Sequence, residues 1–437
     1  MRIEDIVDYF KISNFSWLAK WLALSCLIGM LAGSASAGFL LALDAVTALR
    51  GQYRWLLWCL PAAGFGVAWL YLRYGAGSDA GINLLMNESR APTRTVPLRM
   101  APLVLFGTLM AHLCGASVGR EGTAAQMGGT LSDQLSRLFT VSAATRSMLI
   151  AAGMAAGFAS VFGTPVAGAI WAIEVLAIGA LAHHATGHDA DRAGVLASAL
   201  PALLSYLFPC LLSAFIAHWV ALGLGAQHSH YAAGAIPAIN SMTVLLIAVA
   251  GLAFGLTARA FCLAIHRLSA LFRRLVAYSP LRPVIGGVII IAFAMTVNSA
   301  DRYLGLGLPV IQAAFSGQVA PQDFAIKLVM TAWSVASGFK GGEVTPLFFI
   351  GATLGHVLAP LLQLPPALLA AVGLAAVFGG AANTPLAAAL IAIELFGADI
   401  AVYAGVACAA SYLVSGRHGI YGAQRLLYPK LGKRPDA

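Results

Sequence analysis

The chain has 437 residues, of which 60% are hydrophobic and 10% are charged. A soluble globular domain has about 25% charged residues, so this composition excludes that class and indicates a protein embedded in a membrane. The net charge of +9 does not predict nucleic-acid binding, because the basic residues are scattered over loops and form no stripe with aromatic residues. A bias of basic residues toward cytoplasmic loops explains the charge better.

The first predicted element is an amphipathic segment within residues 1–20. Its apolar residues recur at helical spacing with charges between them, at Ile3, Ile6, Val7 and Phe10. We expect a short helix there, lying on the cytoplasmic surface of the membrane. At the opposite end of the chain, residues 429–437 form a basic tail.

Apolar runs follow along the chain, and a run needs about 20 residues to span a bilayer. Several candidates qualify, among them 21–47, 55–72, 101–118, 195–223, 236–262 and 284–297. Shorter apolar runs are separated by Gly, Pro or Asn, at 148–160, 163–180, 344–362, 366–379, 385–397 and 400–414. Such broken helices survive at membrane depth only where protein or a water-lined cavity satisfies the backbone. The prediction is an all-α polytopic membrane protein with half-length or tilted helices inside it.

One sequence pattern occurs twice. Gly119–Thr123 reads GREGT and is echoed by GGEVTP at Gly341–Pro346. At a similar distance after each motif, a Thr-Pro stretch leads to Ala-Ile-Glu, ending at Glu174 and Glu394. We therefore predict two transmembrane repeats, at 21–223 and 224–428. Proteins built from two such halves place the substrate site where the broken helices meet, so we predict an ion transporter or channel.

Glu121 and Glu343 occupy matching places in the two motifs. GREG follows an apolar run and is typical of a turn that opens a helix, whose free N–H groups and positive dipole end would receive an anion or the Glu121 carboxylate. Alternatively, Glu121 forms a structural ion pair with Arg120. Glu343 either caps the helix that begins near Thr345 or takes part in proton or anion movement. Ionisable residues within membrane spans are costly, which favours function for both.

The remaining polar residues predict less chemistry. We expect Glu174 and Glu394 to be structural partners for polar backbone at helix ends. The stretch His183–Asp191 holds three His and two Asp, a composition that can bind metal, but we interpret it as a solvated loop. We predict no metal site and no cofactor. An intramembrane enzyme is disfavoured, because the carboxylates are duplicated by the repeat and no Ser/Cys–His pair or HExxH motif stands out.

The motifs resemble those of the CLC family of chloride channels and proton-coupled anion antiporters. The resemblance rests on GREG at Gly119–Gly122, on the Gly-x-x-x-Pro break at Gly342–Pro346 and on Tyr421 near the C-terminus. It implies two inverted-topology repeats in a homodimer with one pore per subunit. It also implies that Glu121 is the gate, which enters the anion path and carries the proton, and that Tyr421 coordinates the anion.

The chain departs from the common pattern of that family at several positions. In these departures it resembles the fluoride-transporting branch. Where other members place a serine against the anion, this chain has Gly81-Ile82-Asn83, so Ile82 or Asn83 replaces that contact. The motifs GREGT and GGEVTP, together with Asn383-Thr384-Pro385, resemble those of fluoride transporters. Val175 stands where chloride/proton exchangers carry a second Glu as their internal proton relay.

The resemblance implies a proton-coupled antiporter of the bacterial inner membrane, in contact with lipid, that exports fluoride in exchange for protons. The implied anion site comprises Ile82, Asn83, Gly119, Arg120, Gly122, Val344, Thr345 and Tyr421. A chloride or nitrate channel, or a chloride/proton antiporter of the same fold, remains the alternative, with chloride as the transported anion.

Overall fold

The structure, a computed structural model, describes residues 15–139, 141–185, 192–229, 231–297, 299–317, 319–424 and 426. Within these ranges the regular elements are helices, apart from one isolated bridge between Gly119 and Gly342. The predicted amphipathic helix at the N-terminus and the basic tail lie outside the described residues. Residues 15–20 belong to the first long helix.

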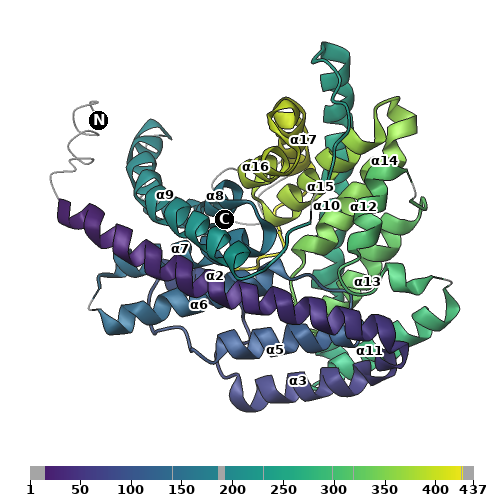
Figure 1. The fold of residues 1–437 in the computed structure, drawn as a ribbon, viewed down its shortest axis with the longest axis horizontal. Coiled ribbons are helices and arrows are strands. Elements are labelled where there is room, and N and C mark those ends of the chain that lie inside the picture. Colours follow the sequence, from purple (N-terminus) through teal and green to yellow (C-terminus); the bar gives the residue numbers. More distant parts are fainter. Residues whose placement is uncertain are drawn as a thin grey trace.

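The helices are arranged as two successive groups (Figure 1). The first group contains α2 (Phe15–Gln52), η1 (Arg54–Cys59), α3 (Leu60–Tyr74), α4 (Ile82–Arg90), α5 (Met100–Leu113), α6 (Glu121–Leu138), α7 (Ala143–Phe162), α8 (Pro165–Ala185) and α9 (Arg192–Gly223). The second contains α10 (Ser241–Leu275), α11 (Leu281–Thr296), η2 (Ala300–Arg302), α12 (Leu308–Ser316), α13 (Asp323–Ser337), α14 (Val344–Leu362), α15 (Pro366–Ala382), α16 (Pro385–Phe396), η3 (Ala398–Ile400) and α17 (Ala401–Val414).

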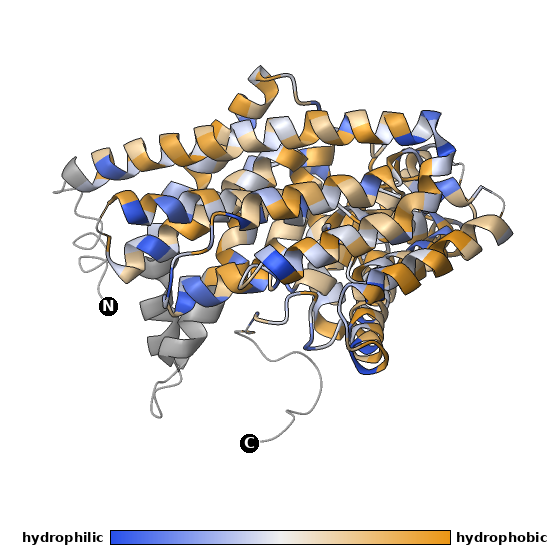
Figure 2. Ribbon diagram, turned by 90° about the horizontal axis from the view of Figure 1, so that it is seen from below, coloured by the Kyte–Doolittle hydropathy of each residue, from blue (hydrophilic) through white to orange (hydrophobic). Residues whose placement is uncertain are grey.

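Apolar residues cover most of these helices (Figure 2). Among the described residues, six helical segments are long and apolar enough to cross a membrane, and six shorter apolar helices accompany them. The mixture of full-length and half-length helices matches the prediction of broken helices. Four runs were assigned to the wrong length class: 101–118 and 284–297 form shorter helices, whereas 148–160 and 344–362 lie in helices long enough to span. Two predicted ends were also wrong. The run 101–118 ends as a helix at Leu113, where Gly115 has a φ of +87°, and the run 236–262 becomes helical only at Ser241, where the Asn240 side chain accepts the Thr243 N–H.

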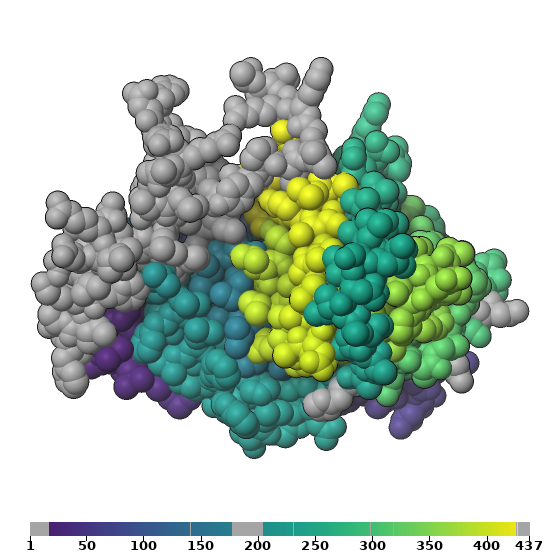
Figure 3. Space-filling model, turned by 90° about the horizontal axis from the view of Figure 1, so that it is seen from above, coloured from purple at the N-terminus to yellow at the C-terminus, as the bar shows by residue number. Residues whose placement is uncertain are grey.

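Helix α7 is the most deeply buried of the six candidate spans. Its small residues let it approach α6 closely: a side chain on Gly157 would clash with the Ala124 carbonyl, and one on Gly153 with Ser132. Glycines at such positions are typical of helix contacts in membrane proteins. Helices α10 and α17 lie side by side in the same manner (Figure 3), with Gly255 against the backbone of Ser411.

The two groups of helices exchange equivalent contacts. Glu174 of α8 accepts hydrogen bonds from the backbone N–H groups of Leu386 (3.1 Å) and Ala387 (2.8 Å), at the start of α16. In return, Glu394 of α16 accepts from Val166 (3.0 Å) and Ala167 (2.7 Å), at the start of α8. Each carboxylate meets the positive end of the opposite helix. This confirms that Glu174 and Glu394 are structural partners of helix ends.

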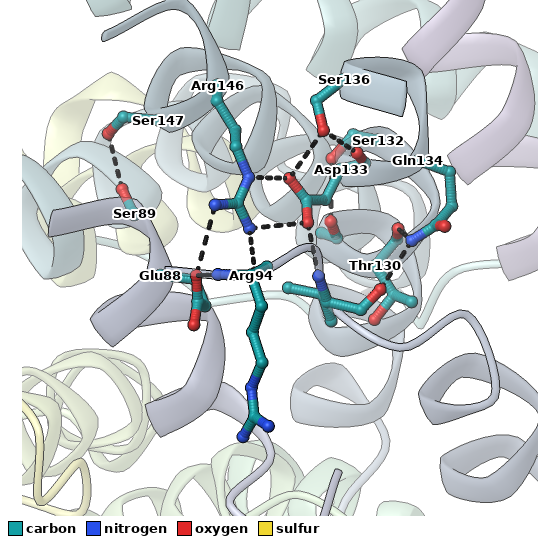
Figure 4. Close-up of polar contacts among 12 residues, drawn as sticks. Glu88, Ser89, Arg94, Thr130, Ser132, Asp133, Gln134, Ser136, Arg146 and Ser147 are labelled. Atoms are coloured by element: carbon teal, nitrogen blue, oxygen red, sulfur yellow. Dashed lines mark hydrogen bonds and ion pairs between the residues drawn. The ribbon is translucent and has the colours of Figure 1, made fainter. Parts of the chain in front are cut away.

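A buried ionic network joins α4, α6 and α7 (Figure 4). Arg146 of α7 forms two hydrogen bonds with Asp133 of α6, at 2.7 and 3.0 Å, and one with Glu88 of α4 at 3.2 Å. Glu88 and Asp133 also accept backbone N–H groups from the segment after α4. The network fixes the end of α4 against the rest of the fold.

We expect Arg146→Met to lower the free energy of unfolding by about 3–5 kcal/mol, because it leaves the fully buried Asp133 carboxylate without its cation. Thermal unfolding of the purified protein in detergent measures the loss. Arg137→Met is the matched control, since Arg137 lies on α6 but is exposed. Equal unfolding temperatures for the two variants would contradict a stabilising role for the network.

Candidate functional site

The two repeated motifs meet at a pair of backbone hydrogen bonds. The Gly119 N–H donates to the Gly342 carbonyl at 2.5 Å, and the Gly342 N–H donates to the Gly119 carbonyl at 2.8 Å. A side chain at Gly119 would lie 2.9 Å from the Gly342 oxygen, and Gly341 has a φ of +153°. Glycine is required here because the two backbones touch and one of them adopts a conformation that other residues avoid.

The bridge places Glu121 against the start of α14. Glu121 is the first residue of α6, as the motif predicts, and its side chain is fully buried. Its carboxylate accepts the Thr345 backbone N–H at 3.1 Å, and both carboxylate oxygens lie 2.7 Å from the Thr345 hydroxyl. The carboxylate is therefore docked at the N-terminus of the helix from the opposite repeat.

The charges around Glu121 explain this docking. The N-terminus of α14 contributes a positive dipole end and free N–H groups. The Arg120 guanidinium lies 3.5 Å from the carboxylate, but its Nε makes no hydrogen bond to any residue that the structure describes. The predicted ion pair with Arg120 thus exists as a charge contact, whereas the hydrogen bonds come mainly from Thr345.

This geometry gives the site its chemistry. The docked carboxylate uses a backbone N–H and a hydroxyl that would equally serve a small anion. A carboxylate and an anion cannot occupy these donors together, so Glu121 competes with any anion that reaches α14. Gly122 and Val344, both buried, complete the walls beside the bridge.

Glu343 lies at the N-cap position of α14, immediately before Val344. Its side chain makes no capping hydrogen bond with the helix, unlike the carboxylates of Glu174 and Glu394. The capping interpretation of Glu343 therefore has no hydrogen bond to support it. Glu343 and Glu121 both lie within electrostatic reach of Tyr421.

The residues at the start of α4 have different surroundings. Ile82 is buried and borders Gly122. A Cβ atom added to Gly122 would lie 3.8 Å from the Ile82 Cδ1 atom. Asn83 instead accepts the Ala423 N–H at 2.9 Å, and Arg90 donates to the Ala423 carbonyl. Helix α4 thus forms an apolar wall through Ile82 and holds the Tyr421 turn through Asn83 and Arg90.

Tyr421 follows α17 and is 5% exposed. Its turn is also held by the Ile420 N–H, which donates to the Ala381 carbonyl at 2.9 Å. The Tyr421 hydroxyl has no hydrogen-bond partner within the described part of the chain. A rigid turn therefore presents a buried, uncommitted hydroxyl.

Comparisons with known proteins identify the family of the chain. The model of the voltage-gated chloride channel family matches residues 63–416. The chain belongs to the CLC family. This CLC protein is an integral, multi-pass membrane protein with an all-helical CLC-type fold, and its family consists of transporters and channels rather than enzymes.

Individual relatives of this CLC protein are similar over almost their whole length. A chloride/fluoride channel protein of Pseudomonas syringae pv. tomato is 49% identical over 419 residues, covering 95% of this chain and 88% of the relative. The crystal structure of a CLC-type fluoride/proton antiporter superposes with a TM-score of 0.85 at 34% identity, covering 94% and 98% of the two chains. A slow cyanobacterial chloride/proton antiporter shares the fold, with a TM-score of 0.76 at 20% identity and coverage of 92% and 96%.

Sequence reasoning missed several residues of this CLC protein. Arg90, Asp133 and Arg146 carried no recognisable motif, and their only signal was charge within a predominantly apolar chain. Within the described side chains no group of three or more His, Cys, Asp or Glu could hold a metal. The predicted loop His183–Asp191 was wrong for His183–Ala185, which are the last helical residues of α8. Residues 186–191 lie outside the described part of the chain, so the solvated loop stays a prediction there.

Proposed function

We propose that this protein is a fluoride/proton antiporter that exports fluoride in exchange for protons. The observation that carries the proposal is the Glu121 carboxylate docked on the N–H and hydroxyl of Thr345, because a group that blocks an anion position and can also take up a proton can couple the two movements. The names of the relatives, one for chloride and fluoride and one for fluoride and protons, support fluoride as the anion.

Coupling follows from two states of Glu121. When ionised, Glu121 occupies the donors of Thr345 and closes the path. When protonated, the carboxyl loses its charge and its attraction to the α14 dipole, so an anion can replace it. The proton and the anion thus use the same site in turn and cross the membrane in opposite directions. The residues assigned to the anion path are Ile82, Asn83, Gly119, Arg120, Gly122, Val344, Thr345 and Tyr421, with Asn83 acting through the Tyr421 turn.

Fluoride suits these donors. It is small and strongly hydrated, so a site must replace its water with short hydrogen bonds. The backbone N–H groups, the Thr345 hydroxyl and the Tyr421 hydroxyl supply such bonds, while Ile82 supplies an apolar wall. With Val175 in place of an acidic relay, Glu343 is assigned to the movement of protons or anions between the site and the opposite side of the membrane.

The proposed assembly follows the family. Two inverted-topology repeats, at 21–223 and 224–428, build one pore in each subunit of a homodimer in the bacterial inner membrane. The matching exchange of Glu174 and Glu394 between the two groups of helices supports the division into repeats. Multi-angle light scattering of the detergent-solubilised protein tests the dimer.

Liposomes containing the purified protein test the proposed function. We expect fluoride efflux, read with an ion-selective electrode, to be accompanied by proton uptake against a proton gradient. Chloride efflux of similar rate would favour the chloride/proton antiporter alternative. Fluoride efflux without proton movement would favour a channel.

Selectivity provides a separate prediction. Ile82→Ser should raise the ratio of chloride to fluoride efflux by roughly 10-fold, because a hydroxyl and a smaller side chain widen the wall beside Gly122 and add a donor. Asn83 is left in place because it holds the Ala423 N–H. Ile82→Val, which keeps the wall apolar, is the control. An unchanged ratio in Ile82→Ser would contradict the assignment of Ile82.

A further inference from the structure

Trp171 of α8 contains an uncommitted donor deep inside the protein. Its side chain is fully buried, yet its indole N–H has no hydrogen-bond partner among the residues described. A buried Trp usually finds a partner for this group, because an unsatisfied donor is costly in an apolar interior. The lack of one is a reason to ask what Trp171 binds.

The unpaired N–H lies beside the unpaired hydroxyl of Tyr421. The two rings meet edge to face, with centroids 6.2 Å apart and planes at 67°, and the indole N–H is in polar contact with the Tyr421 hydroxyl. This contact lacks the distance and angle of a full hydrogen bond, because neither polar atom has a partner of that geometry in the described ranges. Two neutral donors from different helical groups therefore converge at one point.

The surroundings of this pair are aromatic and lead back to the Glu121 site. Phe158 stacks on Trp171 with centroids 4.7 Å apart, and Phe378 lies 6.3 Å from Phe158. Phe348, in the first turn of α14 after Thr345, contacts Phe378 at 5.4 Å. The rings form an aromatic wall in which Trp171 and Tyr421 contribute polar hydrogens.

From these contacts we propose that the Trp171 indole N–H is a direct ligand of the transported anion and shares it with the Tyr421 hydroxyl. The proposal rests on the proposed function and adds a residue to it. An anion that leaves the Thr345 donors meets these two donors next along the aromatic wall. A small, strongly accepting anion such as fluoride gains most from a pair of neutral donors in a buried aromatic setting, because hydrogen bonds to a charged acceptor are the strong ones.

Neighbouring residues hold both Trp171 and the Tyr421 turn in place, which makes Trp171 a suitable specificity residue. Phe158 fixes the plane of the indole, and the Asn83 and Arg90 contacts fix the Tyr421 turn. A site with two immobile donors cannot expand around a larger ion without losing one of them. Trp171 is thus expected to favour fluoride over chloride.

Trp171→Phe tests the proposal, because it removes the N–H and keeps an aromatic ring. We expect the fluoride affinity of the purified protein, measured by titration calorimetry, to fall about 10-fold or more, and the ratio of fluoride to chloride efflux from liposomes to fall with it. Trp333→Phe is the matched control, since the Trp333 N–H is occupied by the Gly286 carbonyl at 3.3 Å. The control should keep the affinity of the unmodified protein.

Two further measurements separate ligation from packing. In a double-mutant cycle with Tyr421→Phe, two ligands of one anion should give non-additive losses of affinity. If Trp171→Phe fails to fold, replacement of Trp171 by benzothienylalanine removes the N–H and keeps the shape of the ring system. Unchanged fluoride affinity in a folded variant lacking the N–H would overturn the proposal. Failure of the unmodified protein to exchange fluoride for protons would instead overturn the proposed function.

Discussion

Glu121→Gln is expected to abolish proton-coupled transport. The glutamine amide can still accept the hydrogen bonds of Thr345 through its oxygen, so the side chain keeps its place at the start of α14. It cannot take up a proton or lose a charge, however, and the exchange between carboxylate and anion stops. Glu121→Ala should also lose coupling, since it removes the group altogether.

The measurement is proton uptake into liposomes driven by an outward fluoride gradient, recorded together with fluoride efflux. Asp79→Asn is the control, because it removes an exposed carboxylate that pairs with Lys340 outside the site. We expect proton uptake in both Glu121 variants to fall to the level of empty liposomes, and Asp79→Asn to behave like the unmodified protein. Intact coupling in both Glu121 variants would refute the assignment of the gate.

Glu343→Gln is expected to slow fluoride and proton flux by at least about 10-fold while the folded protein persists. The carboxylate makes no capping hydrogen bond to α14, so the loss of its charge removes little from the fold. Within a membrane, a carboxylate that caps no helix is costly to keep, which favours a role in the movement of protons or anions.

Glu394→Gln provides the comparison for Glu343→Gln. The Glu394 carboxylate accepts two backbone N–H groups at the start of α8, so its substitution should lower the unfolding temperature more than that of Glu343. Size-exclusion chromatography and thermal unfolding in detergent follow the fold, and liposome assays follow the flux. Normal flux with a normal elution profile in Glu343→Gln would return Glu343 to a structural role.

The sequence by itself determined the features that depend on local pattern. Apolar runs broken by Gly, Pro and Asn predicted the mixture of long and short helices. GREG predicted that α6 opens at Glu121, because glycines and a charged pair directly after an apolar run are typical of a turn that opens a helix. The repeated Ala-Ile-Glu predicted that Glu174 and Glu394 serve helix ends, since a carboxylate in an apolar run needs donors and helix N-termini supply them.

Only the tertiary structure decided which partners these residues meet. Glu121 finds its donors on Thr345, 224 residues further along the chain, and Asn83 turns to Ala423 instead of the anion path. Contacts with other helices define the roles of Arg146, Asp133 and Trp171. Spacing along a chain fixes the face of a helix on which a side chain lies, but packing between helices sets which faces meet, and here it joined the two Gly-rich turns through backbone atoms that carry no side-chain signal.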